Sequence, residues 1–154
     1  MFDDVLINKA ATIERCVARA REEYDENPAT FQSDLTRQDA AILNIQRACE
    51  AALDMAQHLV RRERLGVPQS ARDSFTLLAN AGWIDALLAD AMRRMVGFRN
   101  IAVHDYQSLQ LPIAVSIIQK NSDHVGLHFG DHRSGACVWP GETARGDAVT
   151  CSST

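Results

Sequence analysis

Residues 36–66 read TRQDAAILNIQRACEAALDMAQHLVRRERLG and carry the pattern that decides the fold class. Apolar side chains recur at helical spacing and give one stripe, made of Ile42, Ile45, Cys49, Ala52, Leu53, Ala56, Leu59 and Val60. We expect a helix that begins at Thr36, with Asp39 three residues later in a capping-box-like arrangement, and ends near Gly66. Such a helix must bury its stripe against other elements, so the stretch predicts a packed helical domain.

Four further stretches with the same period surround it, at about residues 5–24, 70–82, 84–105 and 112–121. Ser70 is placed to cap the second of these helices and Gly82 to end it. The side chains expected to face the core are Leu6, Ile13, Cys16, Val17, Ala20, Phe75, Leu78, Ala79, Leu87, Leu88, Met92, Met95, Val96, Ile113, Ile117 and Ile118. Five amphipathic helices with short connectors predict an all-α fold, an antiparallel bundle of four to five helices.

Composition excludes several classes of protein. The chain has 154 residues, of which 46% are hydrophobic and 23% charged, and its formal net charge is −4. No apolar run reaches the roughly 18 residues of a membrane span, and the acidic start of the chain does not resemble a signal sequence. The four cysteines form no CxxC pair, so Cys16 and Cys49 are expected to be buried apolar residues in a cytoplasmic protein.

The composition changes near residue 123. Residues 124–154 hold five of the eight glycines and almost no periodic pattern. We expect a helical domain at 1–123 and an irregular or disordered tail at 124–154. His124, His128 and His132 are four apart in this tail, a spacing that could bind zinc or nickel on a helix, but glycines interrupt it. The sequence therefore predicts neither a metal site nor a cofactor.

The stretch at residues 99–106, RNIAVHDY, concentrates polar side chains in a segment that is otherwise apolar. Asn100 and His104 are four apart and share a helix face, while Arg99 lies about 100° away with a side chain long enough to turn toward that face. This cluster suits metal-free RNA cleavage. A histidine can take the proton of a 2′-hydroxyl or protonate the leaving 5′-oxygen, and a guanidinium can stabilise the phosphoryl charge.

Structural explanations of the same residues remain open. His104 could be buried and hydrogen-bonded, Arg99 could pair with Asp105, and Tyr106 could be a half-buried residue at a helix end. Two arginine groups could steer RNA or could be solvated helix ends; they are Arg61, Arg62 and Arg64, and Arg93 and Arg94. A glycine inside a helix, Gly97, indicates close approach of another backbone or a slight bend.

RNIAVHDY resembles the Arg-x4-His-x-Tyr motif of the HepT-type toxins of the HEPN ribonuclease superfamily. The blocks INKAATIERC, ILNIQRACEAALDMA, LGVPQSARDSFTLLA and MVGFRNIAVHDYQ are similar to that family in the same order, over about residues 4–122. The resemblance implies a homodimeric HEPN bundle with its active cleft between protomers. It also implies that Arg99 and His104 are the catalytic pair and Asn100 the adjacent polar helper.

The resemblance further implies an endoribonuclease toxin of a type VII-like toxin–antitoxin pair. Its partner would be a minimal nucleotidyltransferase antitoxin, which transfers AMP from ATP to the motif tyrosine, here Tyr106. The tail after residue 123 departs from the family pattern. Two other functions stay open: a catalytically idle binding module that docks a nucleotidyltransferase or a nucleotide, and a purely structural helical dimer.

Overall fold

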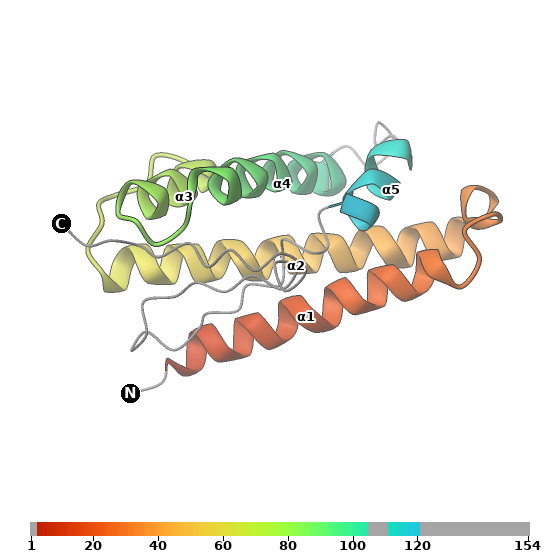
Figure 1. The fold of residues 1–154 in the computed structure, drawn as a ribbon, viewed down its shortest axis with the longest axis horizontal. Coiled ribbons are helices and arrows are strands. Elements are labelled where there is room, and N and C mark those ends of the chain that lie inside the picture. The colour runs from red at the N-terminus through yellow and green to blue at the C-terminus, as the bar shows by residue number, and fades with distance from the viewer. Residues whose placement is uncertain (1–2, 105–110, 121–154) are drawn as a thin grey trace, which may run out of the picture.

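The computed structural model describes residues 3–104 and 111–120, and these residues form a helical bundle (Figure 1). Its elements, in chain order, are α1 (Asp4–Asp25), a short 3-10 helix (Phe31–Ser33), α2 (Leu35–Arg62), α3 (Ala71–Asn80), α4 (Ala86–His104) and α5 (Leu111–Lys120). The described part contains no strand. The all-α architecture predicted from the periodicity is confirmed.

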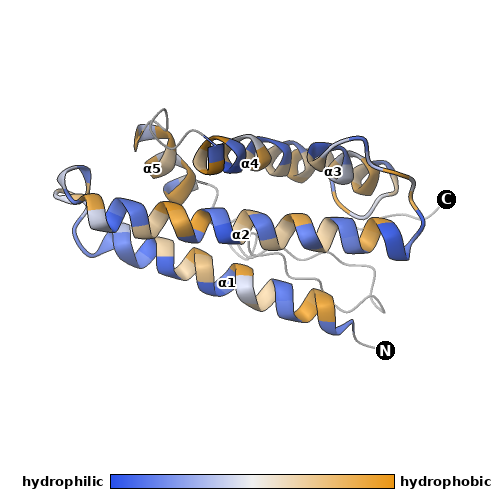
Figure 2. Cartoon of the chain, turned by 180° about the vertical axis from the view of Figure 1, so that it is seen from behind, coloured by the Kyte–Doolittle hydropathy of each residue, from blue (hydrophilic) through white to orange (hydrophobic). Residues whose placement is uncertain are grey.

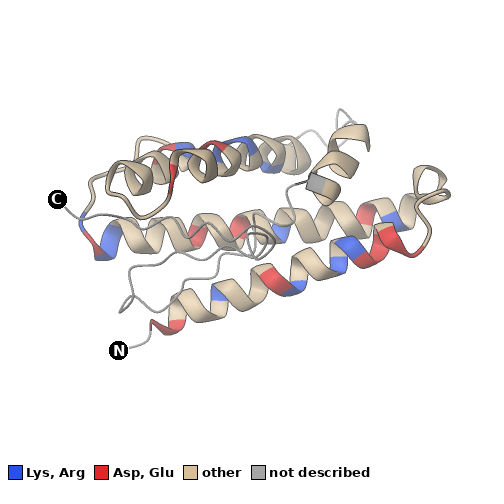
Figure 3. Cartoon of the chain, viewed as in Figure 1, with Lys and Arg blue, Asp and Glu red and all other residues tan. Residues whose placement is uncertain are grey.

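The centre of the bundle is α2, which packs against α1 along its length and against α3 and α4 on another side. The α5 helix lies against α1, where Gln119 Nε2 donates a hydrogen bond to the hydroxyl of Tyr24 at 2.8 Å. Both α1 and α2 carry hydrophilic as well as hydrophobic bands along their length (Figure 2). Basic and acidic residues are interspersed on the long helices rather than gathered by sign (Figure 3), in keeping with the small net charge.

Most of the predicted core is buried, including the whole stripe of α2 and both Cys16 and Cys49. Leu87 was assigned to the wrong face, since its exposed fraction is 83% while that of Leu88 is 5%. Consecutive helix positions differ by about 100° of rotation, and Leu87 lies on the outer side of α4 while Leu88 faces the core. Ile113 is also exposed, at 46%, whereas Ile118 beside Ile117 is buried.

The start of α2 differs from the prediction. Asp34, rather than Thr36, is the N-cap: its backbone is extended and its side chain accepts a hydrogen bond from the Arg37 amide at 3.1 Å. Thr36 instead lies inside the first turn. The carboxylate of Asp34 is a strong N-cap acceptor, and it stands just outside the helix, where capping requires it.

The end of α2 also comes earlier than Gly66. Arg64 adopts a left-handed backbone with φ 54°, and the Leu65 amide donates to the Val60 carbonyl at 3.0 Å, which closes the helix after Arg62. The predicted ends of α3 are confirmed. Ser70 caps its start and Gly82, with φ 78°, follows its last turn.

None of the helices in the described ranges combines the length and apolarity that crossing a membrane requires. The predicted boundary at residues 123 and 124 and the predicted tail lie outside the described residues.

Candidate functional site

The second half of α4 carries Arg99, Asn100 and His104. The buried side of this helix, with Met95 and Ala102, faces the core, while Asn100 and His104 are exposed. Arg99 is five residues before His104, which corresponds to about 140° of rotation around the helix. The Arg99 side chain therefore leaves α4 at the edge of the buried side, next to α2.

Two hydrogen bonds hold the Arg99 guanidinium. Its Nε donates to Glu50 Oε1 of α2 at 2.5 Å, and its Nη1 donates to Asn100 Oδ1 at 2.9 Å. The side chain of Arg99 is 26% exposed and that of Glu50 39% exposed. The guanidinium thus turns toward the helix face of Asn100, while the Glu50 carboxylate holds its Nε. Among the described residues, no further hydrogen bond engages the Nη2 group or the second N–H of Nη1, and these groups can bind an anion.

His104 is the last residue of α4 and its side chain is exposed. It lies one helical turn after Asn100, on the same face. The alternative of a buried His104 is therefore wrong. The observed carboxylate partner of Arg99 is Glu50; Asp105 and Tyr106 lie outside the described residues.

A thiol adjoins this ion pair but takes no part in acid–base chemistry. Burial, with a further contribution from the neighbouring Glu50 carboxylate and an opposing one from Arg99, raises the pKa of Cys49 to about 12. A thiol with this pKa is protonated at neutral pH and is a poor nucleophile. Among the described residues at this end of α4, the groups able to act on a substrate are the guanidinium, the amide and the imidazole.

The two arginine groups considered above differ in their surroundings. Arg62 lies at the C-terminal end of α2, at the opposite end of the bundle from the C-terminal end of α4 (Figure 1), and donates to Asp3 and Glu63 at 2.7 Å. Arg94 pairs with Asp90 at 2.9 Å within α4. Arg62 is therefore a structural residue, remote from His104.

No group of three or more His, Cys, Asp or Glu side chains suited to a metal ion occurs within residues 3–104 and 111–120. The histidines of the predicted tail, His124, His128 and His132, are outside these ranges.

The environment of Gly97 differs from the expected approach of another backbone. A Cβ built on Gly97 would lie 2.8 Å from Arg72 Nη2, and only this guanidinium comes within 4 Å among the surroundings that the structure describes. A side chain from α3, rather than another backbone, occupies the space above the glycine.

Comparison with known proteins agrees with this architecture. The family model described as "Ribonuclease HepT-like" matches residues 13–125. The chain belongs to the HepT-like ribonuclease family. A curated relative, the mRNA nuclease HepT of Shewanella oneidensis, is 52% identical over 118 residues, which cover 77% of this chain and 88% of the relative.

Solved structures of toxin–antitoxin complexes contain chains that are similar to this bundle. A tri-AMPylated HEPN toxin of Shewanella oneidensis in complex with an MNT antitoxin aligns with a TM-score of 0.76 and 49% identity, over 80% of this chain and 92% of that one. A toxin–antitoxin complex with AMP-PNP aligns with the same values. The HEPN-type helical bundle expected from the sequence is thus found in relatives of high identity.

Glu50 is the site residue that the sequence reasoning did not identify. It is the single charged residue between Arg47 and Asp54, among small apolar residues of the α2 stripe. An isolated carboxylate in such a run is a usable signal, because a charge beside a buried surface generally has a partner.

Proposed function

We propose that the chain is a metal-independent endoribonuclease toxin in which Arg99 and His104 are catalytic and Asn100 assists. The observation that carries this proposal is the fixed guanidinium of Arg99, held between Glu50 and Asn100, with an exposed imidazole one turn after Asn100. The mRNA nuclease activity named for the relative that is 52% identical supports the same reaction class.

The reaction needs no external nucleophile, because RNA carries one. The 2′-oxygen loses its proton to a base and attacks the adjacent phosphorus, and the bond to the 5′-oxygen breaks as that oxygen gains a proton. An imidazole can serve as the base or the acid. The free N–H groups of Arg99 can bind the phosphoryl oxygens on which negative charge develops.

Glu50 is a positioning residue in this scheme. A free arginine side chain has many rotamers, and holding one of them before the substrate arrives lowers the entropic cost of reaching the transition state. The contact from Glu50 Oε1 to Arg99 Nε leaves the outer N–H groups of the guanidinium available.

A homodimer completes the chemistry. One imidazole does not readily act as base and acid in the same turnover, and a cleft between protomers would bring two copies of His104 together. Ile101 and Val103 flank this region of α4 with exposed fractions of 42% and 44%, apolar surface that such an interface would cover.

The proposed partner is a minimal nucleotidyltransferase antitoxin that modifies Tyr106, two residues after His104. The tyrosine oxygen would attack the α-phosphorus of ATP and release pyrophosphate. The added phosphate would bring charge and bulk toward Arg99 and exclude RNA. The complex of a tri-AMPylated relative with an MNT antitoxin supports this regulation. A toxin that acts on mRNA would work in the cytoplasm.

The deciding experiment is cleavage of RNA in the presence of EDTA. We expect the wild type to cut and the Arg99→Ala and His104→Ala variants to lose about 10²- to 10⁴-fold in rate. Arg15→Ala, which removes an exposed arginine from α1, is the charge-matched control and should cut normally. A folded wild type that cuts nothing would favour a catalytically idle module that only docks its partner.

A second experiment measures intact mass after incubation with the antitoxin and ATP. The expected gain is a multiple of one AMP, and it should vanish in Tyr106→Phe. A gain that persists in this variant would place the modification on another residue.

A further inference from the structure

The contact between Arg72 and Gly97 joins α3 to the face of α4 that carries the candidate site. A Cβ atom on residue 97 would lie only 2.8 Å from Arg72 Nη2, which is too close. The guanidinium can occupy this position because residue 97 has no side chain. Glycine is a poor choice inside a helix unless packing requires it. The space it leaves is filled by a cation.

The packing register of α3 against α4 directs this cation. Two contacts, one helical turn apart, join α3 to α4. Arg72 lies against Gly97, and Thr76 Oγ1 accepts a hydrogen bond from Arg93 Nη1 at 3.0 Å. The two helices therefore run in opposite directions at this contact. Asn100 lies three residues after Gly97, on the same helix face.

His104 follows seven residues after Gly97 and also falls on this face. It is displaced along the axis by about 10 Å. Arg72 therefore stands beside the exposed row that ends in His104.

Among the described residues, Arg72 also has no carboxylate partner. Arg94 pairs with Asp90 and Arg99 with Glu50, whereas no carboxylate of the described residues forms an ion pair with the exposed Arg72. Since Glu50 offsets part of the charge of Arg99, an anion as large as an RNA strand would gain from an uncompensated cation on the same face.

We propose that Arg72 is a substrate-positioning residue that binds a backbone phosphate beside the scissile one. Gly97 leaves the space in which its guanidinium lies. This inference rests on the proposed function for the identity of the ligand as RNA. Phosphate contacts of this kind set the position of a strand without reading its bases. Arg72 should therefore affect binding of all RNA sequences alike.

The test uses the full chain and a single-stranded RNA in which every ribose is 2′-O-methylated, so that no cleavage occurs. Affinity is measured by fluorescence anisotropy over a range of salt concentrations. We expect Arg72→Gln to weaken binding about tenfold and to reduce the salt slope by about 0.7, the value for one phosphate contact on a single strand. In cleavage of unmodified RNA, KM should rise while kcat stays near that of the wild type.

Gly97→Ala is the matched variant, because it leaves Arg72 in the chain and fills only the space that its guanidinium occupies. The neighbour of the new methyl group is the end of a long side chain, so the helix should fold normally while the guanidinium moves. We expect a several-fold loss of affinity in the wild-type background and no further loss in the Arg72→Gln background. Arg15→Gln, with the same charge change on α1, should retain the wild-type affinity and salt slope.

Wild-type affinity and salt slope in Arg72→Gln would overturn the inference, and so would additive losses in the double variant. Cleavage by the wild type with Arg72-independent binding would overturn this inference alone. Arg72-dependent binding without cleavage would overturn the proposed function alone and leave the phosphate contact supported.

Discussion

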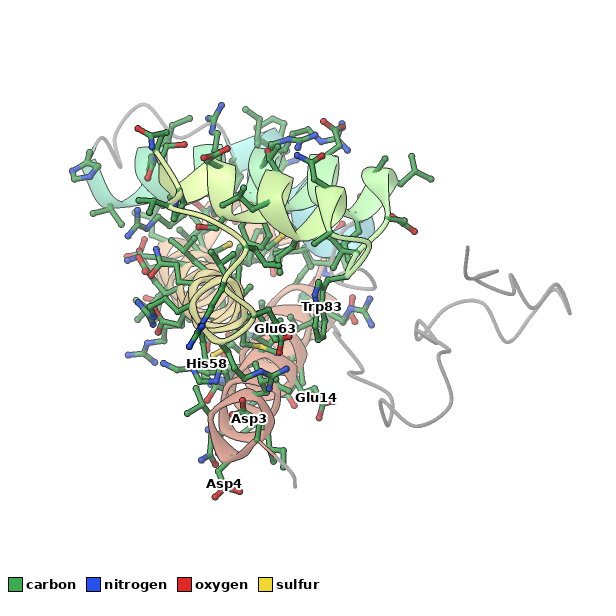
Figure 4. The ribbon with its side chains drawn as sticks, turned by 90° about the vertical axis from the view of Figure 1, so that its left-hand side faces the viewer. Asp3, Asp4, Glu14, His58, Glu63 and Trp83 are labelled. Atoms are coloured by element: carbon green, nitrogen blue, oxygen red, sulfur yellow. The ribbon has the colours of Figure 1, made fainter. Side chains whose placement is uncertain are left out.

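Two regions of the molecule combine an arginine, a histidine and a carboxylate, and they are built in different ways. At the start of α1, Asp3 Oδ2 accepts hydrogen bonds from His58 Nε2 and Arg62 Nη1, both at 2.7 Å. Asp3 and His58 lie together at this end of the bundle, with Glu63 and Trp83 above them (Figure 4). His58 and Arg62 are four residues apart on α2, a spacing that by itself looks as suggestive as that of Arg99 and His104.

The difference lies in what each group is bound to. In the first region the histidine and the arginine converge on one carboxylate, and that carboxylate also caps α1 through the amides of Val5 and Leu6. In the second, the carboxylate holds the inner edge of the arginine while the histidine stays exposed one turn beyond Asn100. Residue spacing therefore does not separate a structural cluster from a candidate active site, whereas the partners of each polar atom do.

Exchanging the two histidines for alanine breaks this comparison most strongly. His104→Ala should lower the RNA cleavage rate by about 10²- to 10⁴-fold, because it removes an acid–base group. His58→Ala should leave the cleavage rate per folded molecule unchanged. It should lower Tm, because it removes a hydrogen-bond donor to the Asp3 carboxylate. Cleavage rates in EDTA and thermal unfolding followed by circular dichroism measure both effects. Equal loss of cleavage in the two variants would contradict the division into two kinds of cluster.

The two glutamates that bind arginine Nε provide a smaller and finer test. Glu50→Gln should lower kcat by up to about 100-fold with little change in stability, because Arg99 loses the contact that orients it. Glu63→Gln weakens the equivalent contact to Arg62 Nε, at 2.7 Å, and should leave kcat at the wild-type value. A Glu50→Gln enzyme with normal kcat would remove the positioning role from Glu50.

How far the sequence predicts the molecule depends on the range of each interaction. Helical periodicity places the stripe of α2 correctly, because burial of an amphipathic helix follows from its own sequence. It cannot choose between neighbours such as Leu87 and Leu88, since the choice depends on where α2 lies. The cap of α2 was misassigned for a related reason: Thr36 and Asp34 are both good caps, and the path of the preceding chain decides between them.

The candidate site divides along the same line. The contact of Arg99 with Asn100 involves adjacent residues and follows from the length of an arginine side chain. The pairing of Arg99 with Glu50 spans 49 positions and exists only because α4 crosses α2 at this register. The packing of Arg72 against Gly97 likewise depends on the register of α3 on α4. A glycine inside a helix signals that something approaches, but it does not say what.

Asp3→Asn gives the smallest expected effect and tests the structural cluster alone. The pKa of Asp3 is lowered from 3.8 to about 2, first by the hydrogen bond from His58 and then by Arg62 and the Leu6 amide, against an opposing effect of burial. A carboxyl whose pKa is lower in the folded state stabilises the fold at pH values above its unfolded pKa. That stabilisation is lost as the pH falls from about 4 to about 2. Wild-type Tm should therefore decline over this window more steeply than the Tm of Asp3→Asn.

Asparagine caps a helix nearly as well as aspartate, so this variant removes the charge and keeps the cap of α1. Its Tm at pH 5 should be a few degrees lower than that of the wild type, and its RNA cleavage at neutral pH should be unchanged. Asp4→Asn, at the exposed next position, should keep the wild-type pH dependence. If Asp3→Asn instead lost cleavage while its Tm hardly moved, the cluster at the start of α1 would belong to the reaction. The partners of its polar atoms would then no longer mark it as structural.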